Sequence, residues 1–330
     1  MEWTADVSVG DWIREHLEDG RDWSTMHAVV PRGFAAYARI LHPASRDRPV
    51  GAAWPPVPYG KHVKEWDAFQ AAGHEIDTER VTWAATASAF GTTMHALAQW
   101  HRIVGPRVVE GEDGPRDAAG WRYSDPMEGS LEPDLVSATA SILARHTSTP
   151  DDGFVAVWEG WGGIVGAMGY GPSRIFLTIG DESADDDPRH DEFLAHAARD
   201  TFNDVFKKPT WQPGILSDEV SRGPRLSLPN RDHVLFRGGV SELADPDWES
   251  RVPWQDRELE THGFAQTAHC PSLVWPQDRA WVLVTEVDYD STIVGGSSEL
   301  VRALVADQRL EVLPLREGAE LAWDADEVNR

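Results

Sequence analysis

The sequence has little that would cross-link the chain or anchor it in a membrane. Of its 330 residues one is a cysteine, Cys270, so no intramolecular disulfide can form, which fits a reducing compartment. No apolar run approaches the ~18 residues needed to cross a bilayer. The first residues have neither the basic nor the apolar segment of a signal peptide. We therefore expect a cytoplasmic protein without a membrane partner.

Positive charge is also scarce. Lys and Arg number 30 against 55 Asp and Glu, which gives a formal net charge of 30 − 55 = −25. Binding to duplex nucleic acid needs clustered cations that displace the counterions of the phosphates, so we expect no nucleic-acid partner. Opposite charges steer proteins together, so the charge favours a basic protein as a macromolecular partner.

What is present is the composition of a globular protein. Hydrophobic residues make up 41% and charged residues 26% of the chain, and its length suits about two domains. Residues 106–130 are rich in glycine, proline and charge, and we interpret them as a linker or surface excursion. They would separate an N-terminal α+β region, residues 1–105, from a C-terminal α+β domain, residues 131–330.

Hydrophobic periodicity predicts helices and strands that are interspersed without regular βαβ repetition. This pattern favours an α+β fold with a mixed or antiparallel sheet and packed helices. The expected helices cover residues 11–19, 66–72, 93–104, 133–143, 191–206 and 298–306. The expected strands cover residues 34–42, 154–158, 174–179, 280–289 and 310–315, and prolines predict a loop over residues 43–60.

The segment after residue 280 is the strongest candidate for chemistry. An extended strand over residues 280–289 would place Glu286 and Asp288 on one face, about 7 Å apart, with Asp290 following. Carboxylates at that separation suit a hydrolase-type acid/base pair, and the next helix start can bind an anion through free N–H groups. That start is formed by Gly295, Gly296 and Ser297. The alternative is a surface turn in which the serine only caps the helix.

Tryptophan is unusually frequent, with 16 residues. Trp158 and Trp161 form the densest patch. Exposed indole rings beside acidic residues stack sugars or cationic ligands, so these two residues are candidate ligand-binding positions. The alternative is that the rings supply apolar area to the core.

Metal and cofactor signals are weak. Residues 181–192 have oxygen ligands at the spacing of a calcium loop, but Asp186 stands where the turn needs glycine. The 13 histidines lack the four-residue spacing of a helical zinc motif, and His101 is expected to be a hydrogen-bonded core residue. No phosphate-binding Gly-Lys-Ser/Thr occurs. We predict no metal and no cofactor, and a packed, inert Cys270.

Two segments resemble a group of uncharacterised actinobacterial proteins. They are residues 281–297, WVLVTEVDYDSTIVGGS, and the region from His146 that includes residues 157–162, VWEGWG. The resemblance covers the C-terminal half and implies a bacterial cytoplasmic origin, but it implies no catalytic residue.

The sequence therefore favours an acidic bacterial binding or interaction protein. Its partner would be a small ligand or a basic protein, in the manner of an immunity protein against a basic toxin. The alternative is a hydrolase that uses Glu286, Asp288 and Asp290 with the glycine-rich turn.

Overall fold

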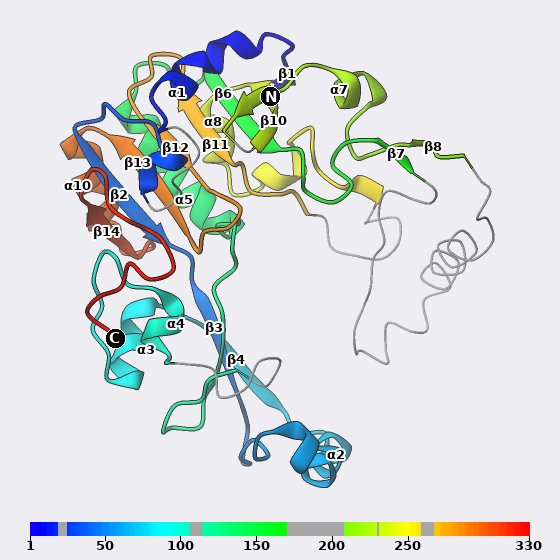
Figure 1. Cartoon of the computed structure of the whole chain (residues 1–330), viewed down its shortest axis with the longest axis vertical. Coiled ribbons are helices and arrows are strands. Elements are labelled where there is room, and N and C mark those ends of the chain that lie inside the picture. The colour runs from blue at the N-terminus through cyan, green and yellow to red at the C-terminus, as the bar shows by residue number, and fades with distance from the viewer. Residues whose placement is uncertain (19–24, 106–113, 170–207, 230, 259–266) are drawn as a thin grey trace. The chain divides into compact units, whose positions relative to one another are not determined.

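The computed structural model describes residues 1–18, 25–105, 114–169, 208–229, 231–258 and 267–330. The chain forms two compact units (Figure 1). Unit 1 comprises Met1–Leu17 and Glu132–Leu283, and unit 2 comprises Glu18–Leu131 and Val284–Arg330. Helices and antiparallel strand pairs occur in both, which confirms the α+β fold class. Within the described ranges, no helix is long and apolar enough to cross a membrane.

This division differs from the predicted one. The chain does pass from one unit to the other at Leu131–Glu132, beside the expected boundary, but both units are discontinuous in sequence. The first 17 residues join the later segment, and the last 47 join the earlier one. A composition shift marks where a chain crosses a surface, whereas strand pairing between distant segments decides which segments share a core.

Unit 1 is built on strand β10 (Arg231–Arg237), which pairs antiparallel with three strands. Its partners are β1 (Glu2–Trp3), β6 (Gly153–Trp158) and β9 (Leu226–Leu228). β11 (Leu273–Pro276) pairs with the other edge of β6. The further strands are β7 (Ala167–Gly169), β8 (Thr210–Gln212) and β12 (Val282–Val284), of which the last ends at the passage into unit 2.

The helices of unit 1 cover an almost wholly apolar core. α5 (Pro133–Leu143) starts with proline, which suits a first helical position, and buries most of its side chains. The other helices are α1 (Asp11–Glu15), α7 (Asp218–Arg222) and α8 (Val240–Leu243). Four tryptophans of this unit are essentially inaccessible to solvent: Trp248, Trp254, Trp275 and Trp281. Burial of these rings accounts for much of the tryptophan content.

The sheet of unit 2 has β2 (Ala36–Leu41) in the middle, between β13 (Ser291–Gly296) and β14 (Val312–Leu315). α10 (Ser298–Ala306) lies against this sheet. The helix begins where predicted because Ser297 accepts a hydrogen bond from the N–H of Leu300, and it buries Leu300 and Leu304.

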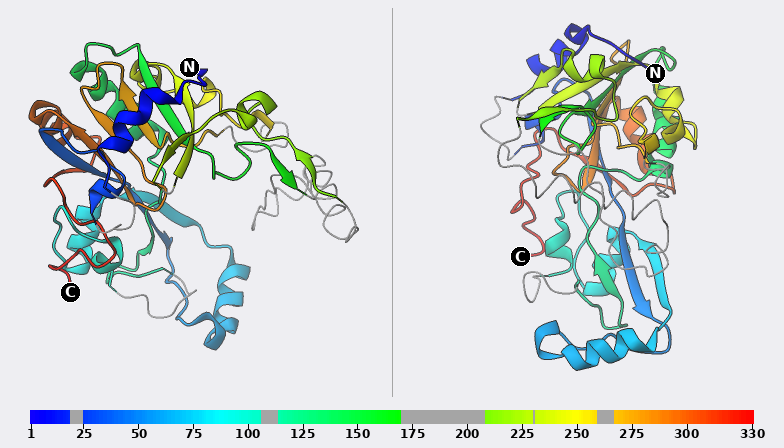
Figure 2. Two further views of the ribbon diagram at one scale, coloured as in Figure 1. Left: turned by 45° about the horizontal axis from the view of Figure 1, so that its top comes forward. Right: turned by 90° about the vertical axis from the view of Figure 1, so that its right-hand side faces the viewer.

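A long ribbon extends from the same sheet region of unit 2. β3 (Ala44–Pro49) pairs antiparallel with β4 (Ile76–Val81) and with β5 (Arg122–Ser124). The ribbon carries α2 (Val63–Ala72) at its far end (Figures 1 and 2). The predicted loop over residues 43–60 and the predicted linker over residues 106–130 are therefore both wrong in part. β3 and β5 are rich in polar residues, so they lack the apolar alternation on which the prediction relied.

Two short helices complete unit 2. α3 (Trp83–Phe90) is capped by Thr82. The Glu311 carboxylate accepts hydrogen bonds from the backbone N–H groups of Trp83 and Ala84. α4 (Trp100–Ile103) is much shorter than the helix predicted over residues 93–104. An aromatic cluster of Trp83, Trp100, Trp121 and Tyr123 fills the space beneath these helices.

Three predictions lie outside the described residues. They are the strand over residues 174–179, the calcium-type loop over residues 181–192 and the helix over residues 191–206.

Candidate functional site

Unit 2 contains a pocket of about 850 Å³. Five segments of the unit line it: β2, α4 with its flanks, the residues after β5, the turn before β13 and the C-terminal segment. The lining includes Arg39, Gln99, Trp100, His101, Asp125, Glu128, Asp288, Tyr289, Asp290 and Trp323.

Arg39 ties three of these segments together. It projects from β2 and is 1% exposed. Its Nη2 donates to Asp290 Oδ1 at 3.0 Å, its Nε to Ser291 Oγ at 2.9 Å, and its Nη1 to the carbonyl of Ala98 at 2.9 Å. A buried guanidinium is tolerated because it has a carboxylate and several oxygen acceptors. Arg39 thus fixes the turn before β13 against the entry to α4.

The turn before β13 is held by its backbone. The N–H of Tyr289 donates to the carbonyl of Glu286 at 3.0 Å, and the Tyr289 carbonyl accepts from the N–H of Gly129 at 2.8 Å. Gly129 has a φ of +68°, and a Cβ there would lie 2.7 Å from the backbone of Val287. Only glycine permits this approach, which brings the segment after β5 against the turn.

A buried histidine connects the same two segments. His42 Nδ1 lies 2.7 Å from the carbonyl oxygen of Met127, and its Nε2 lies 2.9 Å from Thr292 Oγ1. The first contact needs a proton on Nδ1, so Nε2 accepts from the threonine hydroxyl in the neutral ring. Burial lowers the pKa of His42 to about 4, which keeps the ring neutral near pH 7.

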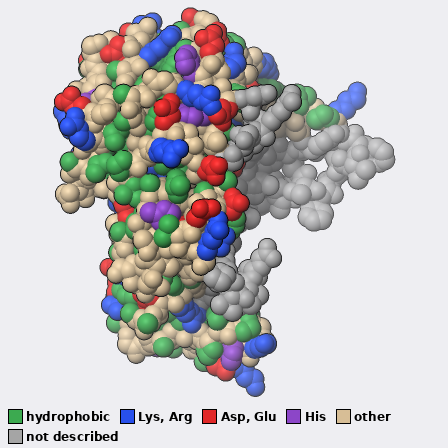
Figure 3. Space-filling view, turned by 60° about the vertical axis from the view of Figure 1, so that its left-hand side comes forward, with side chains coloured by type: hydrophobic (Ala, Val, Ile, Leu, Met, Phe, Trp, Pro, Cys, Tyr) green, Lys and Arg blue, Asp and Glu red, His purple; other side chains and the backbone are tan. Residues whose placement is uncertain are grey.

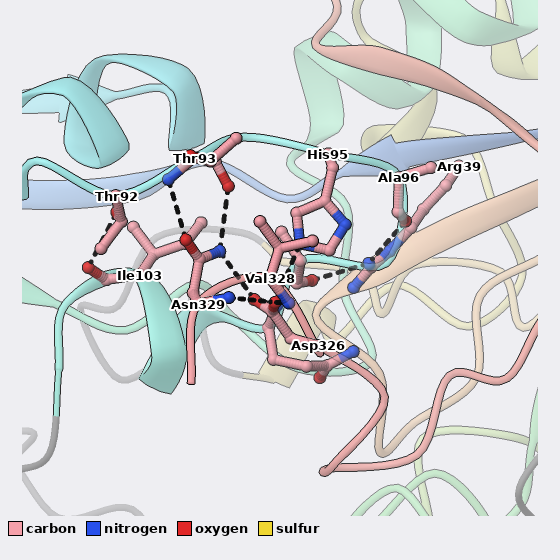
Figure 4. A network of polar contacts seen from close by, with 11 residues as sticks. Arg39, Thr92, Thr93, His95, Ala96, Ile103, Asp326, Val328 and Asn329 are labelled. Atoms are coloured by element: carbon pink, nitrogen blue, oxygen red, sulfur yellow. Dashed lines mark hydrogen bonds and ion pairs between the residues drawn. The ribbon is translucent and has the colours of Figure 1, made fainter.

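The C-terminal wall of the pocket is fastened through Asp326, a fully buried carboxylate (Figure 4). It accepts hydrogen bonds from His95 Nε2 at 2.8 Å and from the N–H of Asn329 at 2.9 Å. The Asn329 amide also bonds both polar backbone groups of Thr93. Although desolvation opposes it, these hydrogen bonds lower the pKa of Asp326 to about 2. We call these hydrogen bonds of Asp326 and Asn329 the C-terminal clasp. The clasp positions the short segment that carries Trp323.

Trp323 and His101 form an aromatic wall. Their rings are parallel, with centroids 3.5 Å apart, and the Trp323 side chain is 70% exposed. Behind them the indole N–H of Trp100 donates to Asp125 Oδ1 at 2.9 Å. Burial lowers the pKa of His101, so its imidazole is mainly neutral at pH 7. An exposed indole at the mouth of a pocket offers a flat apolar face to a ligand.

Carboxylates are concentrated in the pocket. Among the described residues of its lining, Asp125, Glu128, Asp288 and Asp290 are acidic and Arg39 carries the one guanidinium. The pKa of Glu128 is raised by burial and then by the negative charges of Asp290, Asp288 and Asp125. The described part of the lining is therefore mainly acidic.

Three polar atoms at the pocket have no hydrogen-bond partner within the described part of the chain. They are Gln99 Nε2, His101 Nε2 and the hydroxyl of Tyr289. The Gln99 side chain is 7% exposed, so its amide is not compensated by open solvent. Burial raises the pKa of Tyr289 to about 12, so its hydroxyl keeps its proton.

The structure separates the predicted catalytic carboxylates. Asp288 and Asp290 line the pocket, whereas Glu286 is buried outside the lining. The strand predicted over residues 280–289 is limited to β12, Val282–Val284, and residues 287–288 form a turn. The expected alternation that would pair Glu286 with Asp288 is therefore wrong, because the chain must turn here to pair β13 with β2.

The predicted anion-binding turn is also absent at its expected place. Gly295 and Gly296 are buried at the end of β13, and a Cβ on Gly295 would lie 2.7 Å from the Phe34 ring. The small residues allow the aromatic side chains to pack against the strand. Ser297 caps α10, which is the alternative that we weighed for it.

Trp158 and Trp161 belong to unit 1 and are not among the residues that line the unit 2 pocket. Both are partly buried, with ring centroids 5.4 Å apart, and Trp161 stacks on His269 at 4.7 Å. They pack mainly on each other and on neighbouring side chains. Cys270 is buried and forms no disulfide, as predicted for a packed thiol.

Sequence reasoning missed Arg39, Gln99, Glu128 and Trp323. Each stands in a segment without a motif, and tertiary pairing alone brings them together. His101 departs from the expected core residue, since it is half-buried and its Nε2 lacks a partner in the described ranges. A search of the same ranges found no group of three potential metal ligands.

Comparison of the chain with protein-family models, with curated proteins and with solved structures gave no match.

Proposed function

We propose that this protein is a binding protein that holds a small organic ligand in the pocket of unit 2. The observation that carries the proposal is the pocket of about 850 Å³, with the exposed Trp323 ring on one side and several polar groups on the other. Small-molecule sites have volumes of roughly 300–1,000 Å³ and combine apolar walls with a few fixed polar groups.

The way the lining is fixed supports this proposal. The buried side chains of Arg39, His42 and Asp326 form hydrogen bonds that hold the irregular segments around the pocket. A rigid lining reduces the entropy lost on binding. On the face shown in Figure 3, Lys and Arg side chains are scattered among acidic ones, and no continuous basic surface is presented there. The lone thiol and the acidic charge favour a cytoplasmic location and, as a second type of partner, a basic protein.

A thermal-shift screen of the full chain against amines, sugars, nucleotides, carboxylic acids and divalent metals tests the proposal. A ligand that binds the folded state must raise the unfolding temperature. We expect a hit whose shift is lost in Trp323→Ala and kept in Tyr59→Ala, a control at another exposed aromatic residue. Shifts that are the same in Trp323→Ala and the wild type would contradict the pocket as the site.

A hydrolase is the second candidate, favoured by one observation. Glu128, with its raised pKa, shares the pocket with Asp288 and Asp290. Carboxyl groups that share a pocket, one of them with a raised pKa, are the kind of group that general acid/base hydrolysis uses. Turnover of a library of esters, amides and glycosides, abolished in Glu128→Gln, would support this candidate over simple binding.

A further inference from the structure

The far end of the ribbon of unit 2 has almost no core of its own (Figures 1 and 2). Of the 36 residues from Ser45 to Arg80, which include most of β3, α2 and most of β4, only Pro49 and Pro55 are buried. None of the ten residues of α2 is buried, and isolated helices shorter than about 12–15 residues are marginal in water. An ordered segment that buries so little gains stability from a surface that covers it.

Exposed apolar side chains are concentrated at this end of the ribbon. Of the nine large hydrophobic side chains that are exposed in the described ranges, four lie in residues 50–76. Val50, Val63 and Ile76 are among them. The rings of Trp54 and Trp66 stack with centroids 6.3 Å apart and are only half-buried. Burial of apolar surface drives most protein association, so these side chains favour a protein contact here.

The charge of the ribbon differs from that of the rest of the chain. Residues 44–81 contain five Lys and Arg and six Asp and Glu, so their net charge is 5 − 6 = −1. The rest of the chain carries the remaining −24. A basic partner would be attracted to the acidic remainder and would gain little from a nearly neutral ribbon. Two copies of the chain, which repel each other elsewhere, bring almost no net charge together at this place.

The outer face of α2 is complementary to a second copy of itself. Lys64, Asp67, Ala68 and Ala71 share one face of the helix, at the spacing i, i+3, i+4 and i+7, and all four are exposed. When two such helices pack antiparallel about a two-fold axis, Lys64 of each copy lies opposite Asp67 of the other. The same opposite-charge contact therefore forms twice, and the small alanine side chains leave room for it.

The two charges on this face have no partner within the described part of the chain. Further along the ribbon, ion pairs form inside the chain, as between Arg48 and Asp77, whose Nη2 and Oδ2 atoms are 3.5 Å apart. Lys64 and Asp67 form neither a hydrogen bond nor an ion pair with any described residue. Both side chains are therefore available to a second molecule.

We propose that α2 is a self-association surface through which two copies of this chain form a dimer with two-fold symmetry. The antiparallel contact forms the Lys64–Asp67 pair twice and covers apolar surface at both ribbon ends. Stable interfaces bury roughly 1,200–2,000 Å² in total, and a contact between two ten-residue helices is small by this standard. We therefore expect a weak dimer, with a dissociation constant on the order of tens of micromolar. The dimer does not depend on the function proposed for the pocket.

Sedimentation velocity of the full chain, from about 1 μM to about 1 mM, tests the proposal. Lys64→Asp and Asp67→Lys each place like charges opposite one another in the pair, so each should weaken self-association about tenfold. An equimolar mixture of the two variants sets two acidic side chains against two basic ones. A mixed dimer should therefore form with about the wild-type affinity, which is expected only if the two positions lie opposite each other.

Arg316→Asp and Glu317→Lys are the matched controls. They reverse exposed charges of unit 2 outside the ribbon and change the net charge by the same amounts, so they should leave self-association unchanged. Circular dichroism checks that every variant keeps the fold. A chain that stays monomeric throughout the concentration range, or a dimer that neither charge reversal at α2 weakens, would overturn the proposal. Binding of a monomeric chain to phosphatidylcholine vesicles through this end would assign it to a lipid surface and would overturn the proposal as well.

Discussion

The two units differ in what they bury. Within the described ranges, unit 1 buries only His233 and Asp256 among its charged or imidazole side chains. Unit 2 buries Arg39, Glu286 and Asp326 together with His27 and His42. Apolar packing is sufficient to specify the strands and helices of unit 1. The buried polar groups of unit 2 instead hold irregular segments around a pocket, which is where preorganisation for a ligand is needed.

The largest effect should come from removing the central cation of unit 2. Arg39→Met deletes the bonds to Asp290, Ser291 and Ala98, and it leaves a carboxylate without its cation. Breaking a buried pair in this way costs about 3–5 kcal/mol. Urea unfolding measures this loss. The exposed Arg302, whose guanidinium bonds only the Ser298 carbonyl within the described ranges, is the matched control as Arg302→Met. Equal losses in the two variants would refute the importance of the buried network.

Acid should weaken both units over the same pH window. Burial lowers the pKa of His42 in unit 2 and of His233 in unit 1 from 6.5 to about 4. Between these values the unfolded chain binds a proton that the folded chain does not, so stability falls as pH drops below 6.5. Each histidine contributes a loss of about 3 kcal/mol by pH 4. Hydrogen exchange resolved by peptide should show this loss in both units, and a flat profile from pH 7 to 5 in either would contradict the burial of its histidine.

A further loss of stability below about pH 4 should distinguish unit 2 from unit 1. The pKa of Asp326 is lowered from 3.8 to about 2, so its contribution is complete above its ordinary value and is lost as pH falls towards 2. We expect Asp326→Asn to cost about 2 kcal/mol at pH 7 and progressively less below pH 4. Chemical unfolding at several pH values measures this difference. A cost that does not change with pH would show that the clasp acts through packing and not through the ionised carboxylate.

The fold could be predicted from the sequence where apolar periodicity and caps agree. The α10 helix over residues 298–306 and the strand at residues 153–158 follow that pattern, as does the burial of Cys270. The pocket could be predicted only in part. Asp288 and Asp290 were recognised, but for a strand geometry that does not form. Arg39 and Trp323 are 284 positions apart in sequence and have no local signature, so only strand pairing and the C-terminal clasp bring them together.

Removal of the Trp323 ring should have the smallest effect on stability, although it should have a large effect on ligand binding. Trp323 is 70% exposed, so Trp323→Ala should change the free energy of unfolding by no more than about 0.5 kcal/mol. By contrast, Trp275→Ala in unit 1 removes a ring that is 1% exposed and should cost about 3–5 kcal/mol. Thermal or urea unfolding of the two variants measures this contrast. A Trp323 variant as unstable as the Trp275 variant would indicate that the exposed ring is part of the core and not a contact surface for a ligand.

A crystal structure of the chain with a ligand found in the thermal-shift screen tests the central claim most directly. We expect the ligand to lie in the unit 2 pocket with its body against the Trp323 ring. A ligand bound outside this lining, or a pocket filled by the protein's own side chains, would contradict the claim.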